Sequence, residues 1–256
     1  MLFRSPMAGR ETSGPLGARA DLFDDRVWLL TPSGRENPKH VERVRWLAES
    51  CGATVRQLGP DEHDSAVALV SHAPQVLAST LAASLVGEPE DHVNIAGSGL
   101  ADVIRIAASN PDLWGQILVA NAGAVARCLN KVVDRLESVQ AEFERLAAAG
   151  PAAGGGHVDA PVLELLRDGQ QGYARLPGKH GESRMSFAVV SVMVADEPGE
   201  LARLFVAAGD LSVNLEDVRI EHILGRPSGL VDLYVNPESS SILTEGLTAS
   251  GFDVRS

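Results

Sequence analysis

The first sixty residues contain two short apolar runs separated by one amphipathic stretch. Val27–Thr31 and Thr54–Leu58 are rich in β-branched and large apolar residues, which is typical of strands. Pro38–Cys51, between them, repeats apolar residues at helical spacing. The order strand, helix, strand indicates an α/β domain. Because a doubly wound sheet needs helices on both faces, residues 1–59 are too few for a whole one and predict only its last part.

Residues 60–149 show helical spacing of apolar positions throughout. A first helix is predicted from Pro60 to about Val86, where glycine and proline follow as stop signals. A long helix is predicted to begin at Asn110. This residue suits the N-cap, and Pro111 follows at the first helical position.

The predicted long helix carries an unbroken heptad seam. Its apolar residues are spaced alternately by four and three positions: Leu118, Ala122, Val125, Leu129, Val132, Leu136, Val139, Phe143 and Leu146. A seam this narrow requires another helix against it. That helix could belong to the same chain or to a second copy. Since the long helix would span about 50 Å at about 1.5 Å per residue, we favour a homodimer of interlocked helices.

The last seventy residues again show strong order. Residues 150–185 include the glycine-rich segment 150–156 and are predicted to be a linker, with a short helix at Val162–Arg167. The elements expected after it are strands Phe187–Ala195, Val213–His222, Leu230–Val235 and Phe252–Arg255, and helices Pro198–Ala208 and Ser239–Ser250. This βαββαβ order in residues 186–256 is that of the α+β ferredoxin-like fold.

Composition narrows the class of protein. The formal net charge is −12, which argues against a partner such as nucleic acid or a membrane surface. The apolar stretches are interrupted before they reach the roughly 20 residues of a transmembrane helix, so none is predicted. The N-terminus lacks the pattern of a signal peptide, and we expect a cytoplasmic protein. Cys51 and Cys128 are too isolated for a disulfide framework or a CxxC metal site.

One glycine-rich segment superficially resembles a nucleotide-binding turn. Gly97-Ser98-Gly99 begins like G-x-G-x-x-G, but Asp102 stands at the third glycine position and no strand is predicted before it. An acidic side chain there would repel a phosphate. The segment is therefore interpreted as the entry to a helix.

Polar residues within the apolar helices are the better candidates for chemistry. A histidine such as His72 is most often a core residue with its hydrogen bonds satisfied, but Pro74 frees a carbonyl group and bends the helix near it. Arg105 projects from an apolar helix, and arginine can grip a carboxylate with two hydrogen bonds. Asp102, three residues earlier, could simply pair with it. These residues predict an acidic substrate.

Three segments, in the same order, resemble motifs of the prephenate dehydrogenase family. The segment Ser5–Gly14 resembles a Ser-His-Pro-Met-Ala-Gly-x-Glu turn near the end of the family's nucleotide-binding domain. Val70–Pro74 resembles its Ser-His-x-Pro-His segment, and Gly99–Trp114 resembles Gly-Phe/Leu-x-Asp-x-Thr-Arg-Ile-Ala-x-Ser-x-Pro-x-x-Trp. Separately, Ala195–Leu204 with Asn214 is similar to an ACT domain, a regulatory module that commonly binds amino acids.

The resemblance implies oxidative decarboxylation of prephenate to 4-hydroxyphenylpyruvate with NAD or NADP, in tyrosine biosynthesis. That reaction needs an acceptor for the ring hydroxyl proton and a cation for the dianionic substrate. By resemblance, Arg105 is the carboxylate clamp and His72 lies in the substrate pocket. Glu11 and Asp102 join the ionic network around Arg105, and Trp114 closes part of the site, from the same or the partner chain.

Two departures from the family pattern, at Ser5 and in the dinucleotide-binding domain, predict impaired activity, and a third, at Gln75, weakens the comparison of the substrate pocket. Ser5 stands at the family's catalytic histidine position, and a serine has no useful basicity near neutral pH. Gln75 stands where the family often has a second histidine. The glycine-rich part of the dinucleotide-binding domain has no counterpart in the sequence. We therefore expect an N-terminally shortened prephenate dehydrogenase that binds NAD or NADP poorly by itself.

The resemblance gives each predicted region a role. Residues 1–59 are expected to be the α/β remnant of a dinucleotide-binding domain, residues 60–149 an all-α helical dimerisation domain, and residues 186–256 an ACT-like domain. In the last domain, Asp196, Gly199 and Asn214 are expected to lie near a bound ligand, and tyrosine is the expected effector. Gly199 permits close backbone approach at a helix N-terminus.

Three alternatives stay open. The last domain could be merely structural and mediate dimerisation. The protein could be a non-catalytic sensor of aromatic amino acids, built from the helical dimer and the ACT-like domain. It could also be an arogenate dehydrogenase, because arogenate differs from prephenate only in an amino group that replaces the side-chain keto group.

Overall fold

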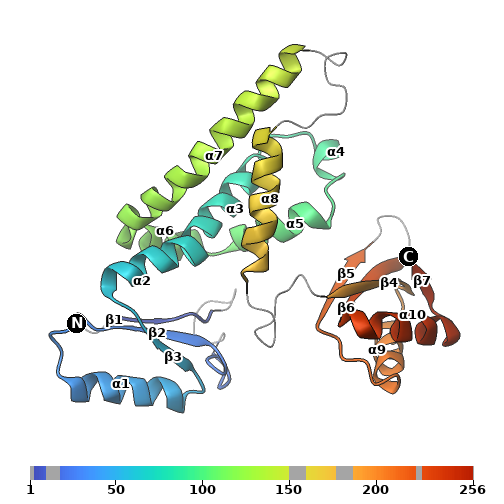
Figure 1. The fold of residues 1–256 in the computed structure, drawn as a ribbon, viewed down its shortest axis with the longest axis horizontal. Coiled ribbons are helices and arrows are strands. Elements are labelled where there is room, and N and C mark those ends of the chain that lie inside the picture. The colour runs from blue at the N-terminus through green and yellow to red at the C-terminus, as the bar shows by residue number, and fades with distance from the viewer. Residues whose placement is uncertain (1–2, 10–17, 150–159, 177–186, 223–226, 256) are drawn as a thin grey trace. The chain divides into compact units, whose positions relative to one another are not determined.

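The chain folds as two compact units, residues 1–138 and 139–256, each described by itself. The computed structural model describes residues 3–9, 18–149, 160–176, 187–222 and 227–255 (Figure 1).

The first unit opens with a three-stranded sheet of order β1-β2-β3. Strand β1 (Phe3–Pro6) pairs antiparallel with β2 (Val27–Thr31), and β2 pairs parallel with β3 (Thr54–Gln57). Helix α1 (Pro38–Ser50) connects the parallel strands. The prediction of strand, helix and strand is confirmed, whereas the hydrophobic pattern did not indicate β1.

One face of this sheet packs against α1. Trp28 and Leu30 of β2 form a buried cluster with Ala48 of α1, where the side chains are 9%, 0% and 0% exposed. After α1 the chain turns at Gly52, whose φ of +80° lies in the left-handed region that favours glycine. A Cβ there would overlap the side chain of Asp24 and approach its Cα to 3.2 Å. The glycine therefore permits the close approach of the Asp24 loop, and the N–H of Asp25 donates to the Gly52 carbonyl at 2.9 Å.

A continuous helical segment follows the sheet. It consists of α2 (Pro60–Val67), a π-helical turn η2 (Ala68–His72) and α3 (Ala73–Ala83). In the turn, the N–H of Ala73 donates to the carbonyl of Ala68, five residues back. At 24 residues the segment is long and apolar enough to cross a membrane, which corrects the expectation that no such stretch exists. The core helix of a soluble protein meets the same criterion.

The helices that follow differ from the prediction chiefly at the long helix. They are α4 (Glu90–Val93), α5 (Ser98–Ile104), the 3₁₀ turn η3 (Arg105–Ala108), α6 (Pro111–Ala120) and α7 (Ala122–Ala149), which continues past residue 138 into the second unit. The N-cap at Asn110 is confirmed, because its side chain accepts hydrogen bonds from the N–H groups of Asp112 and Leu113 at 2.9 and 3.1 Å. The single long helix is wrong, since Asn121 separates α6 from α7.

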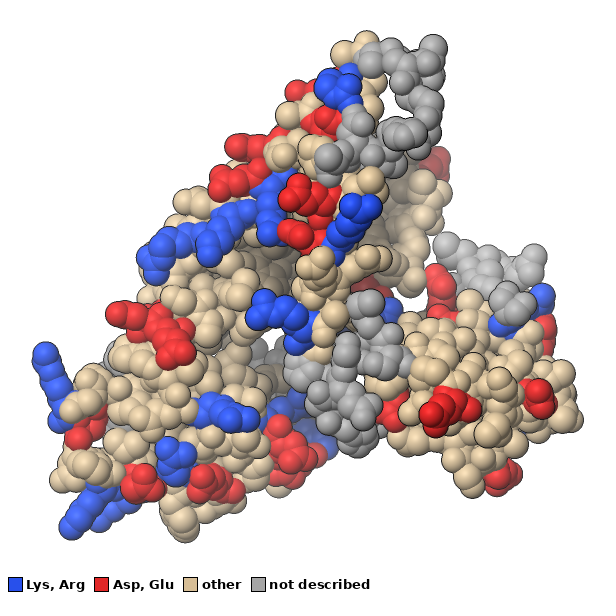
Figure 2. All heavy atoms as spheres, viewed as in Figure 1, with Lys and Arg blue, Asp and Glu red and all other residues tan. Residues whose placement is uncertain are grey.

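The heptad seam is thus divided into a packed and an exposed part. Val125, near the start of α7, forms a buried cluster with Ala68 of η2. Further along, Leu136 and Phe143 are 54% and 55% exposed. Acidic and basic side chains are interspersed along α7 in Figure 2, and Arg145 pairs with Glu142 at 2.6 Å.

The second unit contains a four-stranded sheet of order β5-β6-β4-β7 with antiparallel pairs. The elements are α8 (Ala160–Ala174), β4 (Ala188–Ala195), α9 (Glu200–Asp210), β5 (Asp217–His222), β6 (Ser228–Val235), η5 (Pro237–Ser239), α10 (Ser240–Ala249) and β7 (Asp253–Arg255). From β4 to β7 they have the predicted βαββαβ order. Helix α8 is longer than predicted, and β5 begins four residues later.

A dense apolar core lies between this sheet and helices α9 and α10 (Figure 1). Val192 and Leu233 on the strands, and Leu204, Leu243 and Leu247 on the helices, are all 0% exposed. Alternate residues of β6 are buried, as expected for a strand that has one face against helices.

Candidate functional site

A buried histidine forms the centre of the polar cluster in the helical part. His72 ends the π-helical turn η2 and is 9% exposed. A π-turn inside a helix is frequently found at functional sites. The indole of Trp114 on α6 lies edge-on to the imidazole, with 6.3 Å between ring centroids and 85° between the planes. The structure therefore brings together two of the residues that the sequence singled out.

Asn121 binds His72, although the sequence analysis did not identify it. Its Nδ2 lies 3.2 Å from His72 Nδ1 and donates to the backbone carbonyl of Asp64 at 2.8 Å. The signal that could have found it was an asparagine in the middle of an otherwise regular helix, because asparagine is a weak helix former that competes for backbone hydrogen bonds.

The surroundings of His72 favour its neutral form. Burial lowers the pKa of His72 below the usual value of 6.5, and the neighbouring His63 lowers it further. Asp64 acts in the opposite direction but more weakly. A histidine with a pKa below its usual value is mostly neutral at pH 7.

His63 and Asp64 form a second polar pair on α2 that the sequence analysis missed. His63 Nδ1 lies 2.9 Å from Asp64 Oδ1. The other ring nitrogen, Nε2, is buried and has no hydrogen-bond partner among the described residues. A carboxylate that accepts from Nδ1 leaves Nε2 as the basic atom of a neutral imidazole. The pair thus has the composition of a general base and its orienting group.

Gln75 fastens the turn that carries Arg105. Its side chain is buried, and its Nε2 donates to the carbonyl of Ile106 at 3.1 Å. Ser109 Oγ donates to the same carbonyl at 2.6 Å. Arg105 itself is exposed in η3, and Asp102 is exposed on α5. Arg105 therefore lies on the surface in the anchored turn, and Asp102 lies on the surface of the helix that precedes it.

A cavity of about 370 Å³ lies next to Asn121. It is lined by Asp61 and Asp64 of α2, by residues 119–124 and by Arg127 of α7. Its wall therefore contains carboxylates and a guanidinium. Arg105 does not line it.

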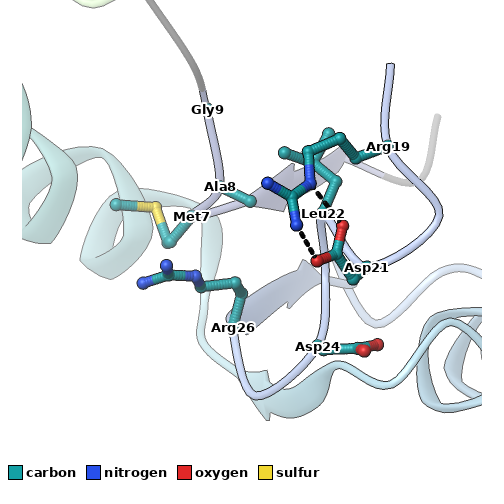
Figure 3. A pocket seen from close by; sticks show the side chains of 8 residues that line it. All are labelled: Met7, Ala8, Gly9, Arg19, Asp21, Leu22, Asp24 and Arg26. Atoms are coloured by element: carbon teal, nitrogen blue, oxygen red, sulfur yellow. Dashed lines mark hydrogen bonds and ion pairs between the residues drawn. The ribbon is translucent and has the colours of Figure 1, made fainter. Parts of the chain in front are cut away.

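A second cavity, of about 450 Å³, lies beyond the end of β1. Its lining consists of Met7, Ala8, Gly9, Arg19, Asp21, Leu22, Asp24 and Arg26. Figure 3 shows the guanidinium of Arg19 held by Asp21, with 2.7 Å between Nε and Oδ1, and Arg26 extending toward Met7. Ser5 lies on β1 opposite Leu29, two residues before this lining. Glu11 lies outside the described residues.

The residues expected to bind an effector lie at opposite ends of the C-terminal sheet. Asp196 follows the end of β4, where its N–H donates to Pro227 at 2.9 Å, and Gly199 has φ +98° at the start of α9. Asn214 precedes β5 and donates to Glu216 at 2.6 Å. The N–H of Glu216 binds Tyr234, at the other end of the strands. One chain therefore does not bring Asn214 to the other two.

The residues present do not fit a complete dinucleotide site. The described part of the first 57 residues has a single parallel strand pair, β2 and β3. The sequence contains no G-x-G-x-x-G, the turn that admits a pyrophosphate. A Cβ built on Gly97 or Gly99 would meet nothing within 4 Å, so these glycines make no close cradle.

Comparison with known proteins identifies the N-terminal α/β part and the helical part that follows it. Residues 4–57 match the family described as prephenate dehydrogenase, nucleotide-binding domain. Residues 59–149 match prephenate dehydrogenase, dimerization domain.

Individual relatives agree with this match. A probable prephenate dehydrogenase, NovF, from Streptomyces niveus is 33% identical over 247 residues, which are 94% of this chain and 67% of that protein. The crystal structure of Aquifex aeolicus prephenate dehydrogenase with hydroxyphenyl propionate and NAD+ is 26% identical, with a TM-score of 0.56 over 67% of this chain and 57% of that one. Synechocystis arogenate dehydrogenase is 25% identical, with a TM-score of 0.52 over 67% and 59%.

These comparisons show how much of its relatives the chain covers and to which family it belongs. The chain spans less than two thirds of the length of both solved relatives. The similarity to NovF nevertheless covers nearly the whole chain. The chain therefore belongs to the prephenate dehydrogenase family.

Proposed function

We propose that this chain takes part in the oxidative decarboxylation of prephenate to 4-hydroxyphenylpyruvate in tyrosine biosynthesis, with NAD or NADP. The observation that carries the proposal is that residues of two family-like segments meet: the buried ring of His72 lies edge-to-face with the half-buried ring of Trp114, with 6.3 Å between centroids. Family membership supports the reaction class. In this reaction an oxidised nicotinamide dinucleotide supplies a hydride acceptor. The described residues do not form a complete site for this dinucleotide.

The remaining roles follow from the residues themselves. Arg105 supplies a guanidinium for a substrate carboxylate from a turn that Gln75 anchors. His72, whose lowered pKa favours the neutral ring, donates a hydrogen bond to a substrate oxygen, and Trp114 lies edge-to-face with that ring. Asp102 and Glu11 complete the charge balance around Arg105. Ser5 accepts no proton near pH 7, so turnover is expected to be slow.

Binding and turnover together test this function. The hydroxyphenyl propionate found with the Aquifex enzyme is a suitable probe for calorimetry, and 4-hydroxyphenylpyruvate formed from prephenate and NAD+ measures turnover. Arg105→Ala is expected to weaken binding by about 10- to 100-fold, since hydrogen bonds to charged groups contribute about 1.5–3 kcal/mol. Arg145→Ala is the control, because Arg145 is exposed and pairs within α7. A chain that neither binds the probe nor forms product is not this enzyme.

Arogenate is a second candidate substrate, favoured by the cavity beside Asn121. Asp61 and Asp64 on one wall and Arg127 on another suit an ammonium and a carboxylate, the two groups of an amino acid. A chain specific for arogenate would bind it more tightly than prephenate, and Asp61→Asn would reduce that preference. Equal preference in both proteins would remove this candidate.

We further propose that the protein is a cytoplasmic homodimer, joined through residues 60–149, with an ACT-like regulatory domain in residues 186–256. The exposed seam residues Leu136 and Phe143 support the dimer.

Tyrosine is the proposed effector of the ACT-like domain, at Asp196 and Gly199, with Asn214 contributed by a second copy. Calorimetry with tyrosine on the wild type and on Gly199→Val tests the effector: absence of binding to the wild type would exclude it.

A further inference from the structure

Asn121 interrupts what the apolar pattern predicts to be one long helix. Helix α6 ends at Ala120 and α7 begins at Ala122, and Asn121 between them has φ −119° and ψ 26°. Neither glycine nor proline occupies this position to impose the break. The side chain instead makes hydrogen bonds to residues 57 and 49 positions earlier, Asp64 and His72. The interruption thus directs one amide group at two partners on the preceding helical segment.

The contact with Asp64 determines which way round the amide lies. A backbone carbonyl oxygen only accepts hydrogen bonds, so the Asn121 atom 2.8 Å from the Asp64 oxygen is the NH₂ nitrogen. The same nitrogen lies 3.2 Å from His72 Nδ1 and has a second hydrogen to donate. His72 Nδ1 therefore accepts, and the proton of its neutral ring is on Nε2.

The other neighbours of His72 are compatible with this state. His63 and Asp64 are the ionisable groups that influence it from α2, and Trp114 faces it from α6 without a charge. An imidazolium would have to donate from both nitrogens, and the NH₂ group of Asn121 offers it no acceptor. Burial further lowers the pKa of His72.

We propose that Asn121 is a positioning residue that holds His72 as a neutral imidazole protonated on Nε2, so that His72 presents a hydrogen-bond donor to a carboxylate or carbonyl oxygen of the substrate. This inference rests on the proposed function, in which His72 belongs to the substrate pocket. It makes His72 a donor and not the base of the reaction. Loss of Asn121 should therefore raise KM more than it lowers kcat.

Nuclear magnetic resonance of the full chain with isotope-labelled histidine reads the protonation of each ring nitrogen. His72→Gln identifies the His72 signals by their disappearance. In the wild type we expect a single neutral form with the proton on Nε2. In Asn121→Asp, the carboxylate accepts where the amide donated, so the proton is expected on Nδ1 and the pKa of His72 is expected to rise. Aspartate has nearly the size and shape of asparagine, and it keeps the backbone hydrogen bonds at the helix boundary, in which the N–H of Asn121 donates to Leu118 at 3.3 Å and its carbonyl accepts from Val125 at 3.1 Å.

Asn110→Asp is the matched control, because Asn110 caps α6 with its side-chain oxygen and has no bond to His72 in its described contacts. It should leave the His72 signals unchanged. A mixture of both neutral forms in the wild type would overturn the inference even if no variant folds, and so would identical His72 signals in Asn121→Asp. Since protonation is read without turnover, a chain that binds no hydroxyphenyl propionate would remove the proposed function and leave this result standing.

Discussion

The helical part and the C-terminal α/β part use apolar residues in opposite ways. In the C-terminal part, the large core residues of sheet and helices, such as Leu204, Leu233 and Leu243, are 0% exposed. In the helical part, Leu69 and Val119 are 64% and 77% exposed, while polar side chains lie buried nearby. The C-terminal core is therefore complete within one chain. In the helical part, some interior positions are occupied by polar side chains and large apolar residues are exposed, and such an apolar surface suits a partner.

The largest expected effect tests the self-sufficient core. Leu233→Ala should lower the free energy of unfolding by about 2–5 kcal/mol, because a fully buried leucine leaves a cavity. Val189→Ala, on the neighbouring strand β4 but 47% exposed, is the control and should cost much less. Urea denaturation followed by circular dichroism measures both. Equal costs would mean that the C-terminal core is not closed as described.

The second effect concerns the exposed seam of α7. Leu136→Asp places a charge on a residue that is 54% exposed in the single chain. If a second copy covers the seam, burying that charge should weaken association by about 2 kcal/mol or more, which is the scale of an interface hot spot. Sedimentation at several concentrations measures the monomer–dimer equilibrium. Val86→Asp, at an exposed residue outside the seam, should leave it unchanged.

A smaller effect is expected where the helical part buries a polar side chain. Gln75→Ala removes the hydrogen bond to the Ile106 carbonyl, which keeps the bond from Ser109. The expected loss of unfolding free energy is about 1 kcal/mol, the net value of a typical hydrogen bond. Gln140→Ala, on exposed α7, is the control. Stability equal to the control would show that Gln75 does not anchor the Arg105 turn.

The smallest effect is a dependence on pH. The pKa of His72 is lowered in the folded chain, so the unfolded chain binds more protons as the pH falls through the usual value of about 6.5. Stability associated with neutral His72 is therefore present above that pH and decreases below it. In thermal melts, the melting temperature should fall as the pH is lowered from 8 to about 5, and His72→Gln should lose part of this pH dependence. His92→Gln, whose side chain is 70% exposed, should keep it.

The same contrast explains what the sequence could predict. Strand β2, helix α1, the cap at Asn110 and the C-terminal βαββαβ order follow from local signals, namely alternation, helical spacing and capping residues. The break at Asn121 depends on partners 49 and 57 residues away, so a regular heptad pattern concealed it.

The candidate site was predictable to a similar degree. Family-like segments indicated His72, Trp114 and Arg105, and the first two do meet. The pairing of His63 with Asp64 depends on the orientation of two adjacent side chains, which no periodicity encodes. The separation of Asn214 from Gly199 follows from strand register, which a motif read along the chain does not include.

The turn at Gly52 has a consequence for the cavity beyond β1. Asp24 is part of that cavity's lining and also the residue that any side chain at position 52 would strike. Gly52 itself is not part of the lining. A methyl group added at position 52 would displace the Asp24 loop. The shape of this cavity can therefore be altered, in evolution or by design, without replacing any residue that a ligand would touch.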